Sequence, residues 1–228
     1  MITNPSPKAI LTLFLLAGII LFSSCSKSNS SATGSARILF ANGCVGATSA
    51  TLTVNGNNLS NGSSVAYLSN SGYQTVATGA ATISSVLTGV GTLGTINTTL
   101  NSGSSYSVFD CGTVLGDTLV IIPDTPPASL GNYAYARLVN VSSDTTATAI
   151  TGAVGNTVVG SNIAYGAASG FVQITPGAYN LTAFNVNKPG NVATLSAVQL
   201  NAGQVYTLMY SGNSSQTVGF KVTVISNN

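Results

Sequence analysis

The sequence predicts an all-β protein made of two tandem β-sandwich domains that follow an N-terminal export signal. Three observations support this prediction. Valine and threonine are abundant between glycine-rich turns, which is typical of β-strands. Several short patterns in the first half of the chain recur about 100 residues later, which indicates a duplicated domain. The chain also opens with an apolar run that ends close to a cysteine.

The composition excludes several classes of function. Charged residues make up 4% of the chain and apolar residues 44%, so the protein is weakly charged but too apolar to be disordered. The net charge of +2 comes from dispersed cations and provides no basic track for phosphate groups, so we expect no nucleic-acid partner. Histidine and glutamate are absent, and the only acidic residues are Asp110, Asp117, Asp124 and Asp144.

Residues 1–24 are predicted to be a signal peptide. Lys8 precedes an apolar run of 13 residues from Ala9 to Leu21, whereas a helix that crosses a membrane needs about 20. The adjoining Leu21-Phe22-Ser23-Ser24-Cys25 resembles the bacterial lipobox, and the resemblance implies that Cys25 is acylated and becomes the first residue of the mature protein. The alternative is an ordinary signal peptide that contains a cysteine by chance.

Residues 25–35 are predicted to form a lipidated tether, because a polar segment follows the cysteine. Several acyl chains give stable anchoring, so the expected partner is a membrane. Ser26 rather than aspartate follows Cys25, which by resemblance to lipoprotein sorting rules favours the outer membrane. The expected location is therefore the cell envelope, with the periplasmic and surface faces both left open.

The internal repeat defines the domain boundaries. Ala36-Arg37-Ile38-Leu39 recurs as Ala136-Arg137-Leu138-Val139 at an offset of 100, and further matches follow in the same order at offsets of 98 and 100. Residues 36–122 are therefore predicted to form the first sandwich and residues 134–228 the second, each large enough to fold alone. Residues 123–133 between them form a proline-rich linker that we expect to be stiff and extended.

Strand patterns within each unit indicate the type of sandwich. Phe220, Val222 and Val224 alternate with less apolar residues, which is the period of a half-buried strand. Asn55-Gly56 predicts a hairpin turn, and residues 187–191 predict a turn before the next strand. About seven short strands per unit favour an immunoglobulin-like fold with Greek-key connections.

A Leu-x-x-Gly-x-x-Tyr pattern ends at Tyr106 in the first unit and at Tyr206 in the second. It resembles the tyrosine corner of fibronectin-type sandwiches, in which a tyrosine hydroxyl bonds back to the preceding connection. Because both repeats contain the pattern, a structural role is favoured over ligand binding.

The second unit resembles the bacterial domain-of-unknown-function family 4397 in three segments. These are residues 136–141 (ARLVNV), residues 176–179 (PGAY) and residues 200–208. The resemblance covers most of residues 134–226 and, more loosely, residues 35–122. It implies secreted or surface-attached β-sandwich modules, often in tandem, and it implies no established activity and no functional residues.

Cys44 and Cys111 are predicted to form a disulfide. Their repeat equivalents, Asp144 and Ser211, both lack thiols, as expected if the two cysteines act as a pair. Export places them in an oxidising compartment, where closing this loop would stabilise the fold by about 4 kcal/mol. The alternative is two buried free thiols. A zinc site would lack ligands, because the chain has no histidine.

No catalytic, cofactor or metal site is expected. Without histidine the chain lacks the usual base for activating a nucleophile, so we predict that the protein is not an enzyme. Asp110 and Asp117 could approach each other across a hairpin, but two carboxylates make a poor calcium site, and we interpret them as ordinary loop acids. Thr118 and Thr145 follow aspartates in a short pattern that resembles a bacterial O-glycosylation sequon.

The scarcity of charge bears on the expected partners. The strand charges are chiefly Arg37, Arg137 and Lys221, which lie on the first and last predicted strands of the units and would guard sheet edges. An edge left unguarded would allow homo-association by strand addition.

The function expected from the sequence is that of a non-enzymatic cell-envelope lipoprotein. Its two β-sandwich modules would serve adhesion, assembly or scaffolding. The alternative is a carbohydrate- or peptide-binding lipoprotein, and the sequence identifies neither a protein nor a glycan partner.

Overall fold

The computed structural model describes residues 34–87, 89–142, 144, 149–213 and 219–228. Within these ranges the chain is built of β-strands and turns, with one short 3-10 turn, η1 (Leu59–Gly62), and no α-helix. No helix in this part of the chain is long and apolar enough to cross a membrane. The predicted all-β fold with two tandem β-sandwiches is confirmed.

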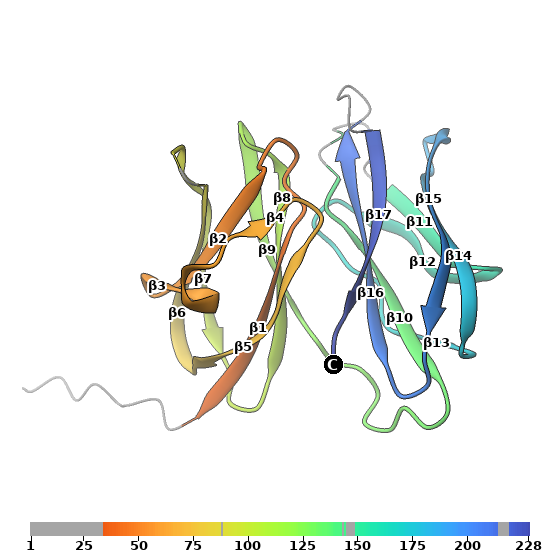
Figure 1. Ribbon diagram of the computed structural model, residues 1–228, viewed down its shortest axis with the longest axis horizontal. Helices are drawn as coiled ribbons and strands as arrows, with labels where there is room; N and C mark the ends of the chain where they lie inside the picture. The colour runs from red at the N-terminus through yellow and green to blue at the C-terminus, as the bar shows by residue number, and fades with distance from the viewer. Residues whose placement is uncertain (1–33, 88, 143, 145–148, 214–218) are drawn as a thin grey trace, which may run out of the picture. The chain divides into compact units, whose positions relative to one another are not determined.

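The first sandwich consists of two sheets, which can be followed in Figure 1. Its strands are β1 (Ser35–Asn42), β2 (Ser49–Val54), β3 (Asn57–Asn58), β4 (Val65–Ala66), β5 (Asn70–Ala77), β6 (Gly79–Leu87), β7 (Gly91–Leu100), β8 (Ser105–Thr113) and β9 (Gly116–Pro123). One sheet has the order β5-β1-β8-β9, and the other has the order β3-β2-β6-β7 with β4 paired to β2.

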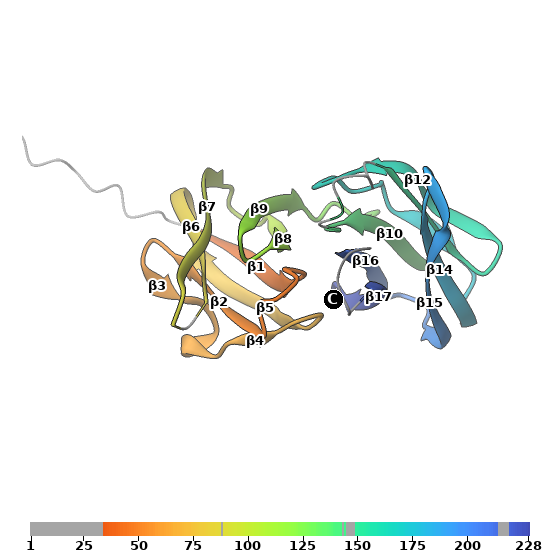
Figure 2. The ribbon, with the colours of Figure 1, turned by 90° about the horizontal axis from the view of Figure 1, so that it is seen from above.

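The second sandwich repeats this arrangement with fewer interruptions (Figure 2). Its strands are β10 (Ala134–Asn140), β11 (Ala149–Val154), β12 (Thr157–Ala164), β13 (Val172–Ile174), β14 (Gly177–Asn185), β15 (Lys188–Leu200), β16 (Val205–Asn213) and β17 (Gly219–Ser226). The sheet orders are β13-β10-β16-β17 and β12-β11-β14-β15.

Local turn chemistry explains one hairpin and corrects one predicted turn. Asn55 and Gly56 have φ angles of 52° and 78°, as a tight hairpin turn requires, and they connect β2 to β3 as predicted. The turn predicted at residues 187–191 is present but lies earlier, at residues 186 and 187, because β15 already begins at Lys188. Pro189 is tolerated there because β15 is an edge strand, where a missing N–H need not cost a ladder hydrogen bond.

The first strand of each sandwich lies inside its sheet. β1 pairs antiparallel with β5 and parallel with β8, and β10 pairs in the same way with β13 and β16. The prediction that Arg37 and Arg137 guard sheet edges is therefore wrong, because both lie on interior strands. Lys221 does lie on an edge strand, β17.

Strand pairing also corrects the alignment of the two repeats. Tyr106 pairs with Ile38, whereas the equivalent Tyr206 pairs with Ala136, so β1 and β10 align at an offset of 98 rather than 100. A slip of two residues preserves the inward and outward faces of a strand, so the apolar pattern does not reveal it. The structural equivalent of Arg137 is therefore Leu39, not Arg37.

The described residues from 34 onward belong to one compact unit. Within it, side chains of both sandwiches contribute to one buried apolar cluster. β8 and β16 are buried along nearly their whole length on both faces, because their outer faces meet across an apolar cluster. The cluster, here called the central interface, draws on both sandwiches: Leu39, Ala41, Phe109, Cys111, Val139, Val141, Met209 and Ile225.

Candidate functional site

The most developed polar constellation among the described residues lies at the central interface. Arg137 on β10 is 2% exposed and forms an ion pair with Asp124, which follows β9. Its Nε donates to Thr207 Oγ1 at 3.0 Å, its Nη1 to the Pro123 carbonyl at 3.2 Å and its Nη2 to Ser107 Oγ at 3.2 Å. One guanidinium therefore binds both sandwiches and the start of the linker.

The Asp124 carboxylate is held by further donors from the first sandwich. Tyr73 donates its hydroxyl to Asp124 Oδ2 at 2.6 Å, and Ser107 Oγ donates to the same oxygen at 2.9 Å. Burial, followed by the Asp124 charge, raises the pKa of Tyr73 to about 12, so this phenol stays a donor. From the end of the chain, Asn227 donates to Tyr73 and Ser107 and accepts from Thr207, which closes the network.

Equivalent residues occupy corresponding places on the two sides of the central interface. The Tyr67 hydroxyl lies 3.1 Å from Ser211 Oγ in the second sandwich. Its equivalent Tyr165 lies against Gly112 of the first sandwich, where a Cβ added to the glycine would stand 3.0 Å from the Tyr165 hydroxyl oxygen. Gly43 lies against Val141 of the second sandwich. A Cβ added at Gly43 would stand 2.5 Å from a methyl carbon of Val141, so the close packing requires glycine. The two sandwiches thus meet through like surfaces, as the subunits of a two-fold dimer do.

The predicted disulfide is wrong in this structure, where Cys44 and Cys111 are free buried thiols. Cys111 points into the central interface, whereas Cys44 packs in a separate small cluster with Ala47 and Leu87. The corrected offset makes Ser142 the equivalent of Cys44, since Cys44 and Ser142 both donate their backbone N–H to the asparagine two residues earlier. Burial raises the pKa of both thiols, which makes them poor nucleophiles.

Two tyrosines make the hydrogen bonds that a tyrosine corner requires. Tyr106 accepts the backbone N–H of Asn101 at 3.1 Å, and Tyr206 accepts that of Asn201 at 3.0 Å. Each hydroxyl ties the start of a buried strand to the preceding turn.

Among the predicted modification sites, Thr118 is exposed on β9, whereas Cys25 and Thr145 lie outside the described residues.

Asp110 and Asp117 are not loop acids, contrary to the interpretation of the sequence. Asp110 on β8 is completely buried, and its Oδ2 accepts a hydrogen bond from Ser85 Oγ at 2.5 Å. Asp117 on β9 lies on the same face, because Asp110 pairs with Leu119 and Gly112 pairs with Asp117. The described residues contain no group of three or more side chains arranged to hold a metal ion.

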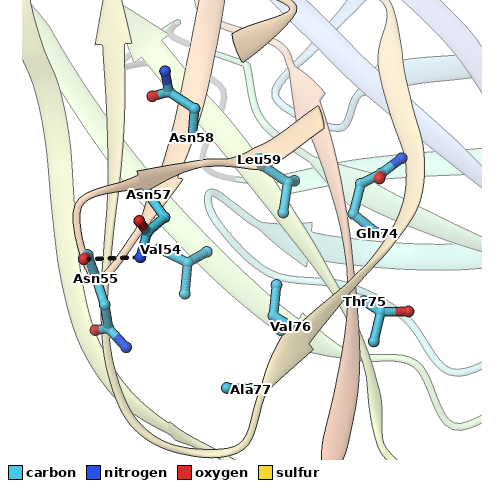
Figure 3. A pocket seen from close by; sticks show the side chains of 9 residues that line it. All are labelled: Val54, Asn55, Asn57, Asn58, Leu59, Gln74, Thr75, Val76 and Ala77. Carbon is cyan, nitrogen blue, oxygen red and sulfur yellow. Dashed lines mark hydrogen bonds between the residues drawn. The ribbon is translucent and has the colours of Figure 1, made fainter. Parts of the chain in front are cut away.

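A shallow groove opens at one edge of the first sandwich, between β5 and the chain that runs from the end of β2 through β3 to the start of η1. Figure 3 shows the side chains of Val54, Leu59 and Val76 converging on its floor. Its volume is about 280 Å³, and its rim carries uncharged amides, among them Asn58 and Gln74. In the second sandwich the corresponding strand, β12, is continuous over eight residues, so the groove depends on the interruption at η1.

Sequence reasoning did not identify Arg137 or Asp124 as a site. Two signals were available. Asn42 and Asn140 stand 98 residues apart and make equivalent bonds, since each donates its side-chain amide to a backbone carbonyl 23 residues later. Ser71 and Ser169, also 98 residues apart, accept backbone N–H groups in the same way. When the repeats are aligned on these asparagines and serines, Arg137 is equivalent to the apolar residue Leu39, so its charge has no counterpart in the first repeat.

Comparison with known proteins gives one family and no characterised relative. The sequence profile described as "Domain of unknown function (DUF4397)" matches residues 36–151 and 134–228. No curated protein matches the sequence closely enough to count as a relative.

Three crystal structures of candidate cell adhesion proteins from Bacteroides are similar at 10% identity. For the protein from Bacteroides uniformis the TM-score is 0.28, and the match covers 83% of this chain and 96% of that one. For Bacteroides fragilis the values are 0.25, 79% and 84%, and for Bacteroides eggerthii 0.22, 85% and 95%. These scores are too low to establish a shared fold.

Proposed function

The chain belongs to the DUF4397 family, and from this premise we propose that it is a non-enzymatic cell-envelope lipoprotein. Its two β-sandwiches would act as one stiff module in adhesion, assembly or scaffolding. The observation that carries the proposal is the central interface, where a buried ion pair and a large apolar cluster join the two sandwiches. Such an arrangement suits a protein that must hold a fixed shape.

The chemistry of the described side chains supports a role without catalysis. The chain has no histidine, and both described thiols are buried with raised pKa values. The groove of Figure 3 is lined by no lysine, aspartate or cysteine, so it lacks the groups that activate a nucleophile.

Anchoring is proposed to depend on Cys25 and to place the module at the outer membrane. Replacing Cys25 with serine should abolish incorporation of radiolabelled palmitate and release the protein from the membrane fraction, because sulfur is the acylated atom. Lys27→Ser, which changes the tether but keeps the cysteine, is the matched control and should stay labelled. Palmitate incorporation that persists in Cys25→Ser would rule out this anchor.

A second candidate function is capture of an uncharged glycan or extended peptide in the groove beside β5. The specific observation in its favour is the pairing of an apolar floor with amide side chains, which can exchange hydrogen bonds with hydroxyl or peptide groups.

Arrays of neutral glycans and peptides test this candidate. Binding should weaken at least about tenfold in Gln74→Ala if the amide contributes one desolvated hydrogen bond. Gln173→Ala changes an exposed glutamine of the second sandwich and should leave binding unchanged. Equal binding by both variants would exclude the groove.

A further inference from the structure

The carboxyl groups of Asp110 and Asp117 stand where the second sandwich has an aromatic pair. Their equivalents in β16 and β17 are Tyr210 and Phe220, whose rings stack with centroids 5.3 Å apart and an interplanar angle of 16°. The first sandwich therefore replaces a stacked apolar contact with two acids in the same interior position. This replacement needs a physical reason, because burying a charge without a partner is costly.

The two acids have no opposite charge to offset their burial. Asp110 Oδ1 and both oxygens of Asp117 are buried without a hydrogen-bond partner of ordinary geometry. The titratable groups that act on the pair or face it are Cys44 on the loop after β1, Cys111 on β8 and Tyr165 of the second sandwich. None of these can carry a positive charge. The four described cations, Arg37, Arg137, Lys188 and Lys221, are not among the groups that influence either acid.

We propose that Asp110 and Asp117 form a shared-proton pair that holds this end of the first sandwich closed at acidic pH and loosens it as the pH rises through neutrality. Two neighbouring carboxyl groups in a dry interior cannot both ionise cheaply, so a proton is retained between them. Loss of that proton leaves adjacent negative charges that must draw in water.

The titration follows from the same geometry. Burial, followed by the charge of Asp117, raises the pKa of Asp110 to about 7, and burial raises that of Asp117 to about 6. Both values exceed those of an unfolded chain, which are near 4. The folded state therefore binds more protons than the unfolded state between about pH 4 and about pH 7. The free energy of unfolding should fall over that interval and become level above it.

The part of the fold that would loosen is small and identifiable. Val45 forms a parallel bridge with Thr113, and the Cys44 thiol lies in the cluster that covers this end of the sandwich. Gly94 on β7 comes so close to Asp117 that a Cβ there would lie 3.1 Å from Oδ2. Water drawn in by the ionised pair should therefore loosen the close contact between Asp117 on β9 and Gly94 on β7 and expose Cys44.

Carboxyl NMR of the full chain tests the pair directly. The chain has four aspartates and no glutamate, so a sample labelled with carbon-13 in aspartate gives only four side-chain carboxyl signals. Two of them should titrate with midpoints near 6 and 7, and Asp110→Asn should remove one and return the other toward its usual range. Ionisation of all four groups below about pH 5 would overturn the proposal.

Thiol protection tests the loosening, with an internal control. The rate of Cys44 alkylation, divided by its rate in the unfolded chain at the same pH, should rise through neutrality, whereas that of Cys111 in the central interface should change little. Asp110→Asn should abolish the rise. Ser85→Ala should shift it to higher pH, because the Ser85 hydroxyl lowers the pKa of Asp110. Ser84→Ala on the opposite face should behave like the wild type.

A bound cation is the competing explanation for the pair. If calcium raised the melting temperature of the wild type at about pH 8 but not that of Asp110→Asn, a cation rather than a proton would occupy the pair, and the proposal would fail. The shared proton instead requires equal melting temperatures with calcium and with chelator.

Discussion

Replacing Arg137 with alanine is expected to lower the free energy of unfolding by about 3 to 5 kcal/mol, because it leaves the Asp124 carboxylate buried without its ion-pair partner. The substitution also removes donors to Thr207 and Ser107, which lie on strands of different sandwiches. Urea denaturation followed by intrinsic tyrosine fluorescence measures the loss.

The matched control is Arg37→Ala on β1. Arg37 is exposed and lies over the Tyr73 ring at 4.2 Å, so its loss should cost at most about 1 kcal/mol. Replacing both charges, as in Arg137→Met with Asp124→Asn, should recover part of the stability, because neither charge is then stranded. Equal losses for Arg37→Ala and Arg137→Ala would refute the buried role assigned to Arg137.

Replacing Phe109 with alanine is expected to cost about 3 to 5 kcal/mol, because it empties a fully buried site in the central interface. Val139 and Met209 of the second sandwich belong to the same cluster, so both sandwiches should lose support. Differential scanning calorimetry measures the loss and shows whether the two sandwiches still unfold together.

Phe184→Ala on β14 provides the comparison for Phe109. Phe184 is only partly buried and lies on the outer face of its sheet, so its removal should cost clearly less. A cost of less than about 1 kcal/mol for Phe109→Ala would mean that the outer face of β8 is not packed in solution.

The fold class could be predicted because its signals are local. Asn55-Gly56 requires positive φ angles that suit a hairpin, and the alternation in β2 from Ser49 to Val54 matches a strand with one buried face. The duplication could be predicted because short local patterns recur in the same order about 100 residues later. The tyrosine pattern also fixed the position of Tyr106 and Tyr206 relative to the preceding turn.

The packing between the sandwiches was missed because it depends on contacts distant in sequence. Ile38-Leu39-Phe40-Ala41 is a continuous apolar run, which is the pattern of a strand buried on both faces. When the first repeat is considered alone, this run predicts only a strand in the core of the first sandwich, not a strand whose outer face packs against the second sandwich. The two-residue slip in alignment then paired Arg137 with Arg37 and concealed the charge that faces the first sandwich.

The acid pair and the free thiols were misinterpreted for a related reason. Asp110 and Cys111 are neighbours on β8, so their side chains point to opposite faces. Asp110 points between the sheets of the first sandwich, and Cys111 points into the central interface. The sequence suggested a pairing of Cys111 with Cys44 and an approach of Asp110 to Asp117, but it carried no information about which face each side chain would occupy.

The packing of the two sandwiches as one unit is tested most directly by residual dipolar couplings of backbone amides in a weakly aligned sample. A single alignment tensor should fit the couplings of both sandwiches, from β1 to β9 and from β10 to β17, as the central interface requires. Two tensors of different magnitude or orientation would show that the sandwiches move independently, and would contradict the buried roles assigned to Arg137 and Phe109.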